Sequence, residues 1–146
     1  MGRGDRLADA ALAWLGTPYR HNAKIRGVGV DCARFVIGAC EDAGLIDRDS
    51  LVLGDFSNEW ALHHSKDVMR EVAERYCFLV HEARRGDIFL YQYGRVASHA
   101  GIYLGCDRVI HAYIDVGVVI SSVHDSIFFR KNGSSRLKYV YRLRGQ

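Results

Sequence analysis

The apolar residues change their spacing partway along the chain, and this change constrains the fold more than any other feature. Up to residue 76, apolar residues recur at helical spacing over 5–15, 32–43 and 58–76. From residue 86, short apolar runs bounded by turn residues predict strands at 86–93, 98–104, 108–113, 116–123 and 136–144. Because helices come first and antiparallel strands second, we expect an α+β fold with one sheet covered by helices.

The length of the chain predicts a single domain, and its net charge argues against nucleic-acid binding. The chain has 146 residues, which suits a single domain over residues 1–146. Its net charge of +3 is too small and too dispersed to predict nucleic-acid binding. The basic residues of 130–144 fit either the solvated face of a last strand or weak attraction to an anionic polymer. We expect no nucleic acid as a partner.

Neither a membrane span nor an export signal is expected. No run approaches the roughly 18 apolar residues that a transmembrane helix needs. The first 16 residues are short and amphipathic, and Asp5 and Asp9 interrupt them, so they match a secretory signal poorly. The sequence therefore leaves the localisation open.

The four cysteines do not form a recognisable metal or disulfide pattern. None belongs to a CxxC pair, and zinc ligands are usually spaced more tightly. A disulfide framework is not expected in a domain of this size without a secretion signal. Cys40 falls on the apolar stripe of the predicted helix 32–43, so we interpret it as a core thiol. No metal and no organic cofactor are expected.

Cys32 lies where a glycine-containing loop is expected to become a helix. Asp31 is a suitable N-cap, so Cys32 would occupy the first helical turn. Unpaired backbone N–H groups and the positive end of the helix dipole favour a thiolate there. A thiolate is the nucleophilic form of cysteine, so this position suits covalent catalysis. The alternative is a buried structural cysteine that happens to begin a helix.

A general base is available in the predicted hairpin. If the loop consists of the three residues 105–107, His99 lies opposite Tyr113 and His111 lies opposite Gly101. Both histidines then share one sheet face, on a diagonal of about 7–8 Å. One imidazole can then act as base while the other orients it. A two-residue loop would place them on opposite faces, and two unrelated histidines remain the alternative.

Five segments, in this order along the chain, resemble the NlpC-type cell-wall peptidases, which are papain-like cysteine peptidases. They are GTPYRH (16–21), VDCARFV (30–36), RRGDIFLY (84–91), SHAGIYLG (98–105) and VIHAY (109–113). The C-terminal 30 residues are similar to compact versions from phage-tail and gene-transfer clusters. The resemblance implies a papain-like α+β fold and a possible phage-tail-like assembly as carrier.

The resemblance also implies a role for each matched residue. Cys32 would be the nucleophile, His99 the general base and later acid, and His111 the orienting third residue. Tyr19 matches a loop tyrosine whose hydroxyl lies near the thiol and would help to hold the oxyanion. Asp31 would combine helix capping with contact to a substrate ammonium group.

The chain departs from the family pattern directly after the cysteine. Where the family has Ser-Gly, this chain has Ala33 and Arg34. The serine helps some members to recognise a free stem-peptide amine, so Ala33 puts that specificity in doubt. Arg34 would either meet a substrate carboxylate or point to solvent.

These observations together predict an enzyme that cleaves amides of peptidoglycan stem peptides through a thioester. The resemblance implies the bond between D-glutamate and the diamino acid. An amidase acting between muramic acid and L-alanine, and a non-catalytic tail or wall-binding component, are the alternatives. For the mechanism to hold, Sγ of Cys32 should lie within roughly 4 Å of a His99 ring nitrogen.

Overall fold

The computed structural model describes residues 1–54 and 67–145. Helices α1 (Arg3–Leu12), α2 (Cys32–Asp42) and α4 (Val68–Tyr76) precede most of the strands, with the short β1 (Lys24–Ile25) and β2 (Gly29–Val30) between α1 and α2. The later elements are β3 (Cys77–Leu79), β4 (Ile88–Gln92), β5 (Ala97–Gly105), β6 (Arg108–Tyr113), β7 (Gly117–Ser122), the 3₁₀ turn η1 (Ser126–Phe128) and β8 (Leu137–Leu143). The predicted α+β class is confirmed.

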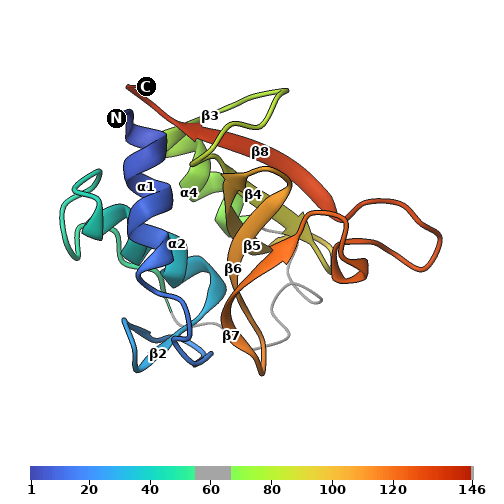
Figure 1. The fold of residues 1–146 in the computed structure, drawn as a ribbon, viewed down its shortest axis with the longest axis horizontal. Coiled ribbons are helices and arrows are strands. Elements are labelled where there is room, and N and C mark those ends of the chain that lie inside the picture. The colour runs from blue at the N-terminus through green and yellow to red at the C-terminus, as the bar shows by residue number, and fades with distance from the viewer. Residues whose placement is uncertain (55–66, 146) are drawn as a thin grey trace.

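Six strands form the main sheet, in the order β3-β8-β4-β5-β6-β7. Every neighbouring pair is antiparallel, as the sequence pattern predicts. The last strand, β8, returns to lie between β3 and β4, which brings the two chain ends close together (Figure 1). The long connection through η1 projects away from the helices in the same view.

The predicted helix boundaries hold in the middle of the chain and fail at its start. Helix α2 matches the prediction within one residue, and α4 ends at the predicted Tyr76. The predicted start of that third helix, near residue 58, lies outside the described residues. Helix α1 begins after Gly2, before the predicted start at residue 5, and Gly2 offers no side-chain cap. Asp5 lies in the first turn, where a carboxylate favours the helix dipole.

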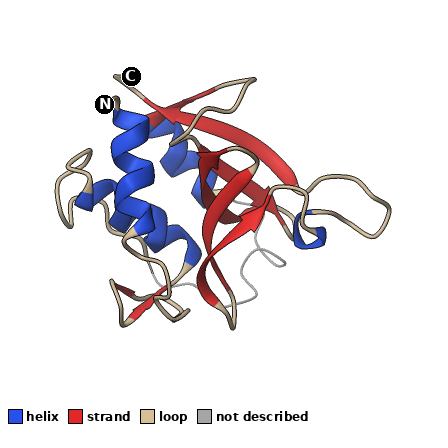
Figure 2. Cartoon of the chain, viewed as in Figure 1, coloured by secondary structure: helices blue, strands red, loops and turns tan. Residues whose placement is uncertain are grey.

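Both faces of the sheet carry apolar side chains. Helices α1 and α2 cover one face and bury residues such as Leu7, Phe35, Ile102 and Ile110 (Figure 2). On the other face, Phe128 of η1 packs with Phe89, Tyr91 and Val109. Successive residues of a strand point to opposite faces, so one strand contributes side chains to the apolar cores on both faces of the sheet. The η1 connection is therefore a second cover for the sheet.

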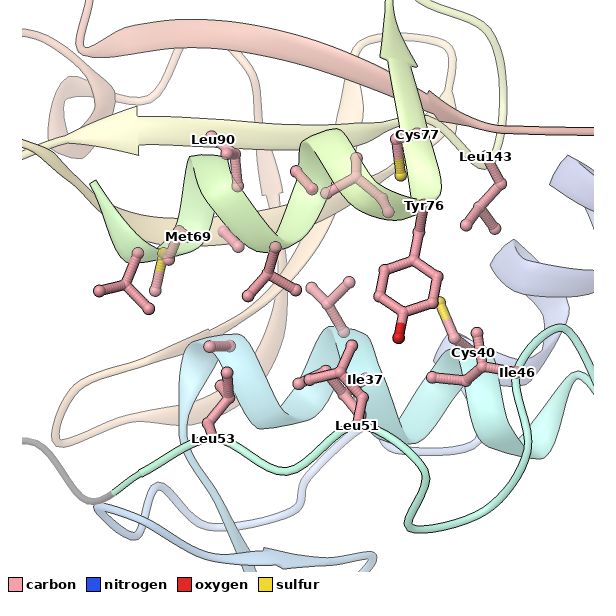
Figure 3. A pocket seen from close by; sticks show the side chains of 17 residues that line it. Ile37, Cys40, Ile46, Leu51, Leu53, Met69, Tyr76, Cys77, Leu90 and Leu143 are labelled. Atoms are coloured by element: carbon pink, nitrogen blue, oxygen red, sulfur yellow. The ribbon is translucent and has the colours of Figure 1, made fainter. Parts of the chain in front are cut away.

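An apolar pocket lies between α2 and α4 (Figure 3). Leu51 and Leu53 approach it from the loop after α2, and the ring of Tyr76 points into it. Its walls carry almost no hydrogen-bonding groups, and Cys40 and Cys77 contribute buried thiols. Cys32, His99 and His111 are not among its lining residues. This pocket belongs to the hydrophobic core and offers no polar groups for catalysis.

Candidate active site

The sequence folds locally to place Cys32 at the first position of α2. Asp31 adopts an extended backbone conformation with φ −95° and ψ 177°, and its carboxylate accepts a hydrogen bond from Arg34 N at 2.9 Å. This side chain therefore caps the helix, as the sequence predicts. The N–H groups of Cys32 and Ala33 belong to the first turn, so no preceding helical turn supplies them with carbonyl partners.

The thiol of Cys32 lies against strand β5 beside His99. Its Sγ donates a hydrogen bond to the carbonyl oxygen of Ser98 at 3.6 Å, and the Ala100 backbone N–H also faces the sulfur. Within residues 1–54 and 67–145, no hydrogen bond joins the sulfur to His99 itself. The predicted approach of Sγ to a His99 ring nitrogen stays a prediction, and the hydrogen bond of the sulfur goes to the residue next to His99.

Cys32 is a neutral thiol at rest. Burial, and to a smaller extent the negative charge of Asp31, raise its pKa to about 12. The backbone N–H groups of Ala100, Ala33 and Cys32 oppose this rise without cancelling it. Desolvation outweighs the helix dipole because the side chain is 7% exposed. The N–H groups at the helix start favour a thiolate, as the sequence predicts, but they do not offset burial, so the thiol needs a base.

A turn and a bulge together bring the two histidines to one sheet face. Cys106 and Asp107 have φ values of 51° and 61°, which is the geometry of a two-residue type I′ turn. The predicted three-residue loop is therefore wrong. A bulge at Leu104 restores the predicted register, because Ile102 still pairs with Ile110. One extra residue in the bulge shifts the strand by the same amount as one extra residue in the loop. His99 and His111 therefore still point to the same face of the sheet.

The two imidazoles are hydrogen-bonded to each other inside the protein. His99 Nε2 and His111 Nδ1 are 2.8 Å apart, and His111 Nε2 is 2.8 Å from the hydroxyl of Ser121. His99 Nδ1 is the remaining ring nitrogen and forms no hydrogen bond with the described residues. It is the nitrogen that could accept a proton from a thiol or donate one to a leaving group.

Aromatic rings surround this histidine pair and keep it neutral. Tyr91 and Tyr93 each lie 5.8 Å from the His99 ring, and Phe128 lies 5.2 Å from the His111 ring, measured between centroids. Burial and, to a smaller extent, the neighbouring His111 lower the pKa of His99 to about 3, and burial lowers the pKa of His111 to about 4. Both rings are therefore uncharged at neutral pH, as a general base must be.

Tyr19 lies beside the thiol, as the resemblance implies. It bridges to Val30, directly before Asp31 in the chain. Burial raises the pKa of its hydroxyl, and the nearby Cys32 and Asp31 raise it further, whereas the Cys32 backbone N–H lowers it. The Tyr19 hydroxyl is therefore a neutral O–H donor that lies near the backbone N–H of Cys32.

Asp31 and Arg34 form a closed ion pair inside the protein. Arg34 Nη1 lies 2.7 Å from Asp31 Oδ2, which also accepts from Asn22 N at 2.8 Å. Arg34 Nη2 donates to the carbonyls of Leu53 and Gly54, each at 3.0 Å. Because Arg34 is 8% exposed, it neither points to solvent nor offers its guanidinium to a substrate, and both expected roles fail on this geometry.

Three further groups have structural roles. Asp87 is buried, accepts from Arg84 N at 2.8 Å and pairs with Arg142 at 2.8 Å, so its carboxylate fixes the turn before β4. Cys40 is buried in the core as predicted. Arg142 belongs to the basic C-terminal residues, and its charge is used inside the fold.

Residues 1–54 and 67–145 contain neither a cluster of metal-ligating side chains nor a membrane-spanning helix. There, no three His, Cys, Asp or Glu side chains gather in a way that could hold a metal ion. None of the helices in these residues has the length and apolar character needed to cross a bilayer.

Comparison with known sequences matches residues 16–134 to the NlpC/P60 family. The chain belongs to this family. A murein DD-endopeptidase MepS/murein LD-carboxypeptidase of Escherichia coli K12 is 24% identical over 131 residues, which cover 90% of this chain and 61% of the relative. A probable endopeptidase of Haemophilus influenzae is 31% identical over 121 residues, or 82% of this chain and 65% of the relative. The chain thus spans about three fifths of these relatives.

Solved structures of NlpC/P60 domains have the same fold as this chain. The NlpC/p60 domain of the peptidoglycan hydrolase SagA superposes with a TM-score of 0.63 at 21% identity, covering 96% of this chain and 98% of that one. RipD of Mycobacterium tuberculosis, described as a non-catalytic NlpC/p60 domain adapted to peptidoglycan binding, gives a TM-score of 0.57 at 21% identity, covering 97% and 98%. The fold therefore occurs both with and without catalysis, and function must be argued from the site.

Sequence reasoning missed Ser121. It lies within an apolar strand, where a single hydroxyl carries little signal. Its position beside His111 depends on the register of the β6–β7 pair, in which His111 opposes Val119 and Val109 opposes Ser121. Only a correct pairing of these two strands could have identified it.

Proposed function

We propose that this NlpC/P60 domain is a cysteine peptidase that hydrolyses an amide bond in the peptide stems of peptidoglycan. One observation carries the proposal. The Cys32 thiol lies at a helix N-terminus against the strand of His99, whose Nε2 is held by His111 at 2.8 Å. A nucleophile, a base and a group that orients the base are thereby gathered at one place. A purely wall-binding domain has no need of this arrangement.

The first step transfers the thiol proton to His99. The S–H bond turns from the Ser98 carbonyl to His99 Nδ1 as Sγ attacks the substrate carbonyl carbon. Transfer must accompany attack, because a thiol of pKa about 12 and an imidazole of pKa about 3 do not form an ion pair at rest. The N–H groups at the start of α2 and the Tyr19 hydroxyl are the donors for the developing oxyanion.

The second half of the reaction reverses the proton transfer. The imidazolium of His99 gives its proton to the departing amine as the C–N bond breaks, which leaves a thioester on Cys32. His99 then takes a proton from water as the water oxygen bonds to the thioester carbon, and it returns that proton to the sulfur as the C–S bond breaks, which releases the acid and restores the thiol. Cys32 and His99 thus carry all the proton transfers of the proposed reaction, without a metal or an organic cofactor.

The cleaved bond has two candidates. The resemblance noted in the sequence implies the bond between D-glutamate and the diamino acid. The name of the Escherichia coli relative, a DD-endopeptidase, favours a D,D-bond of the peptide cross-link instead. Because Arg34 is used inside the protein, no contact from it to a stem carboxylate is part of this proposal. Delivery by a phage-tail-like assembly stays a prediction.

Digestion of purified murein by the wild type and by Cys32→Ala tests the proposal. We expect the wild type to release fragments, and we expect Cys32→Ala and His99→Ala to release them at least about 10³-fold more slowly, as when a catalytic triad loses a member. Mass spectrometry distinguishes the bonds. A cut after D-glutamate shortens the stems, a D,D-cut converts cross-linked dimers to monomers, and an amidase frees whole stems. Equal release by the wild type and Cys32→Ala would contradict the mechanism.

A further inference from the structure

The histidine pair continues to a third group that none of the roles above uses. Ser121 lies on β7, and its Oγ is 2.8 Å from His111 Nε2. Residues 119 and 121 share one sheet face, and His111 lies opposite Val119, so Ser121 is the diagonal neighbour of His111 on that face. The chain of groups runs from the free Nδ1 of His99 through His111 to this hydroxyl.

Hydrogen-bond accounting shows why the last group matters. A neutral imidazole carries one N–H, so the 2.8 Å contact between His99 and His111 allows two arrangements. In one, His99 donates from Nε2, its Nδ1 is bare, and His111 must donate from Nε2 to Ser121. In the other, His111 donates from Nδ1 and its Nε2 accepts from the Ser121 hydroxyl, while His99 carries its proton on Nδ1 and cannot accept the thiol proton there.

The arrangement that supports catalysis becomes obligatory once His99 is protonated. The imidazolium of His99 has protons on both nitrogens, so His111 Nδ1 must accept, and the His111 proton must then sit on Nε2. That N–H is fully buried, since His111 is 0% exposed, and Phe128 lies 5.2 Å from its ring. A buried N–H without an acceptor is costly, so the acceptor at 2.8 Å matters most when His99 is charged.

We propose that Ser121 is a positioning residue whose hydroxyl accepts from His111 Nε2 and thereby stabilises the arrangement in which His99 can take, and then hold, the Cys32 proton. The proposal rests on the proposed function for its effect on turnover, but the tautomer itself is a property of the free protein. Ser121 touches neither the sulfur nor the substrate. Its contribution passes entirely through His111.

A pair of variants of equal shape isolates the hydroxyl. Ser121→Thr keeps the oxygen and Ser121→Val replaces it with a methyl group, and both residues favour strands. Ser122→Ala is the matched control, because Ser122 is the next residue on β7, faces the opposite side and only accepts from His124 N at 3.1 Å. A folding defect common to Ser121→Thr and Ser121→Val cancels in their comparison.

Three measurements are made on these full-length variants. Murein digestion gives kcat and KM, and the ¹⁵N shifts of His99 and His111 give the tautomers. The rate at which iodoacetamide alkylates Cys32, followed by mass spectrometry of cysteine peptides, reports proton removal without any substrate. Cys106 is exposed on the β5–β6 turn and serves as the internal reference in the same sample.

For Ser121→Val we expect kcat and the Cys32 alkylation rate to fall about ten- to a hundredfold, with KM unchanged within about twofold. The share of His99 that carries its proton on Nε2 should be equal in the wild type and Ser121→Thr and lower in Ser121→Val, because a methyl group leaves the buried His111 Nε2–H without an acceptor. Ser122→Ala should match the wild type. Equal rates and equal tautomers in Ser121→Thr and Ser121→Val would overturn the proposal.

The readouts also separate this proposal from the proposed function. If the wild type leaves murein intact while the tautomer and alkylation differences appear, the proposed function fails and the role of Ser121 stands. If murein is cleaved in a Cys32-dependent manner while the Thr and Val variants behave alike, the role of Ser121 fails alone.

Discussion

Two buried polar clusters flank Cys32, and they differ in whether their hydrogen bonds are complete. The Asp31–Arg34 pair is charged, and protein groups bind both of its side chains at 2.7 to 3.0 Å. The His99–His111–Ser121 cluster is neutral, and His99 Nδ1 has no partner in the part of the chain that the structure describes. The Asp31–Arg34 pair has its hydrogen bonds filled by protein groups, so it holds the backbone in place. The histidine cluster leaves Nδ1 of His99 open, so that nitrogen can take part in a reaction.

The largest expected effect tests the closed cluster. Arg34→Met removes one partner of a buried ion pair and leaves Asp31 charged without compensation. We expect it to lower the free energy of unfolding by about 3 to 5 kcal/mol, measured by urea denaturation.

Arg48→Met is the control for the closed cluster, because Arg48 pairs with Asp42 at 2.8 Å but is 60% exposed, so its loss should cost less than about 1 kcal/mol. Similar losses for Arg34→Met and Arg48→Met would remove the distinction between the two clusters.

The second effect tests the neutrality of the histidine cluster. Burial lowers the pKa of His99 to about 3 and that of His111 to about 4, below the ordinary value of 6.5. Between those values the unfolded chain binds more protons than the folded one, so stability falls as the pH drops below 6.5. From pH 6.5 to 5 we expect a loss of at most about 2 kcal/mol per histidine. The measurement is Tm against pH.

A double variant sharpens this result. Replacing both histidines, as in His99→Gln with His111→Gln, removes both titrations, so the fall in Tm between pH 6.5 and 5 should become smaller than in the wild type. A pH dependence that is unchanged in the double variant would mean that other groups cause the loss.

The smallest expected effect concerns the turn that sets the register of the histidines. Asp107 has φ 61°, a conformation that glycine adopts without strain, and type I′ turns favour glycine at this position. Asp107→Gly should raise the free energy of unfolding by a few tenths of a kcal/mol, because its ion pair with His124 at 3.6 Å is exposed. Murein cleavage should not change, since the bulge at Leu104 keeps the same register. A change in activity would show that the turn reaches the site.

The sequence by itself determined the main helices and the later strands and their order, but not the short β1, β2 and β3. Helical spacing and strand alternation are local properties, so α2, the β5–β6 hairpin and the cap at Asp31 could be predicted from neighbouring residues. The matched segments also identified Cys32, His99 and His111 as one candidate set, because such segments record which residues act together even when they lie far apart.

Only the tertiary structure decided how those residues are charged and paired. The raised pKa of Cys32 and the lowered pKa of His99 depend on desolvation by segments distant in the sequence, and desolvation overrides the helix dipole. The burial of Arg34 depends on the carbonyls of Leu53 and Gly54, and the partner of His111 depends on strand β7. Burial and long-range pairing depend on residues that are distant in the sequence and meet only in the folded chain, so no local sequence pattern predicts them.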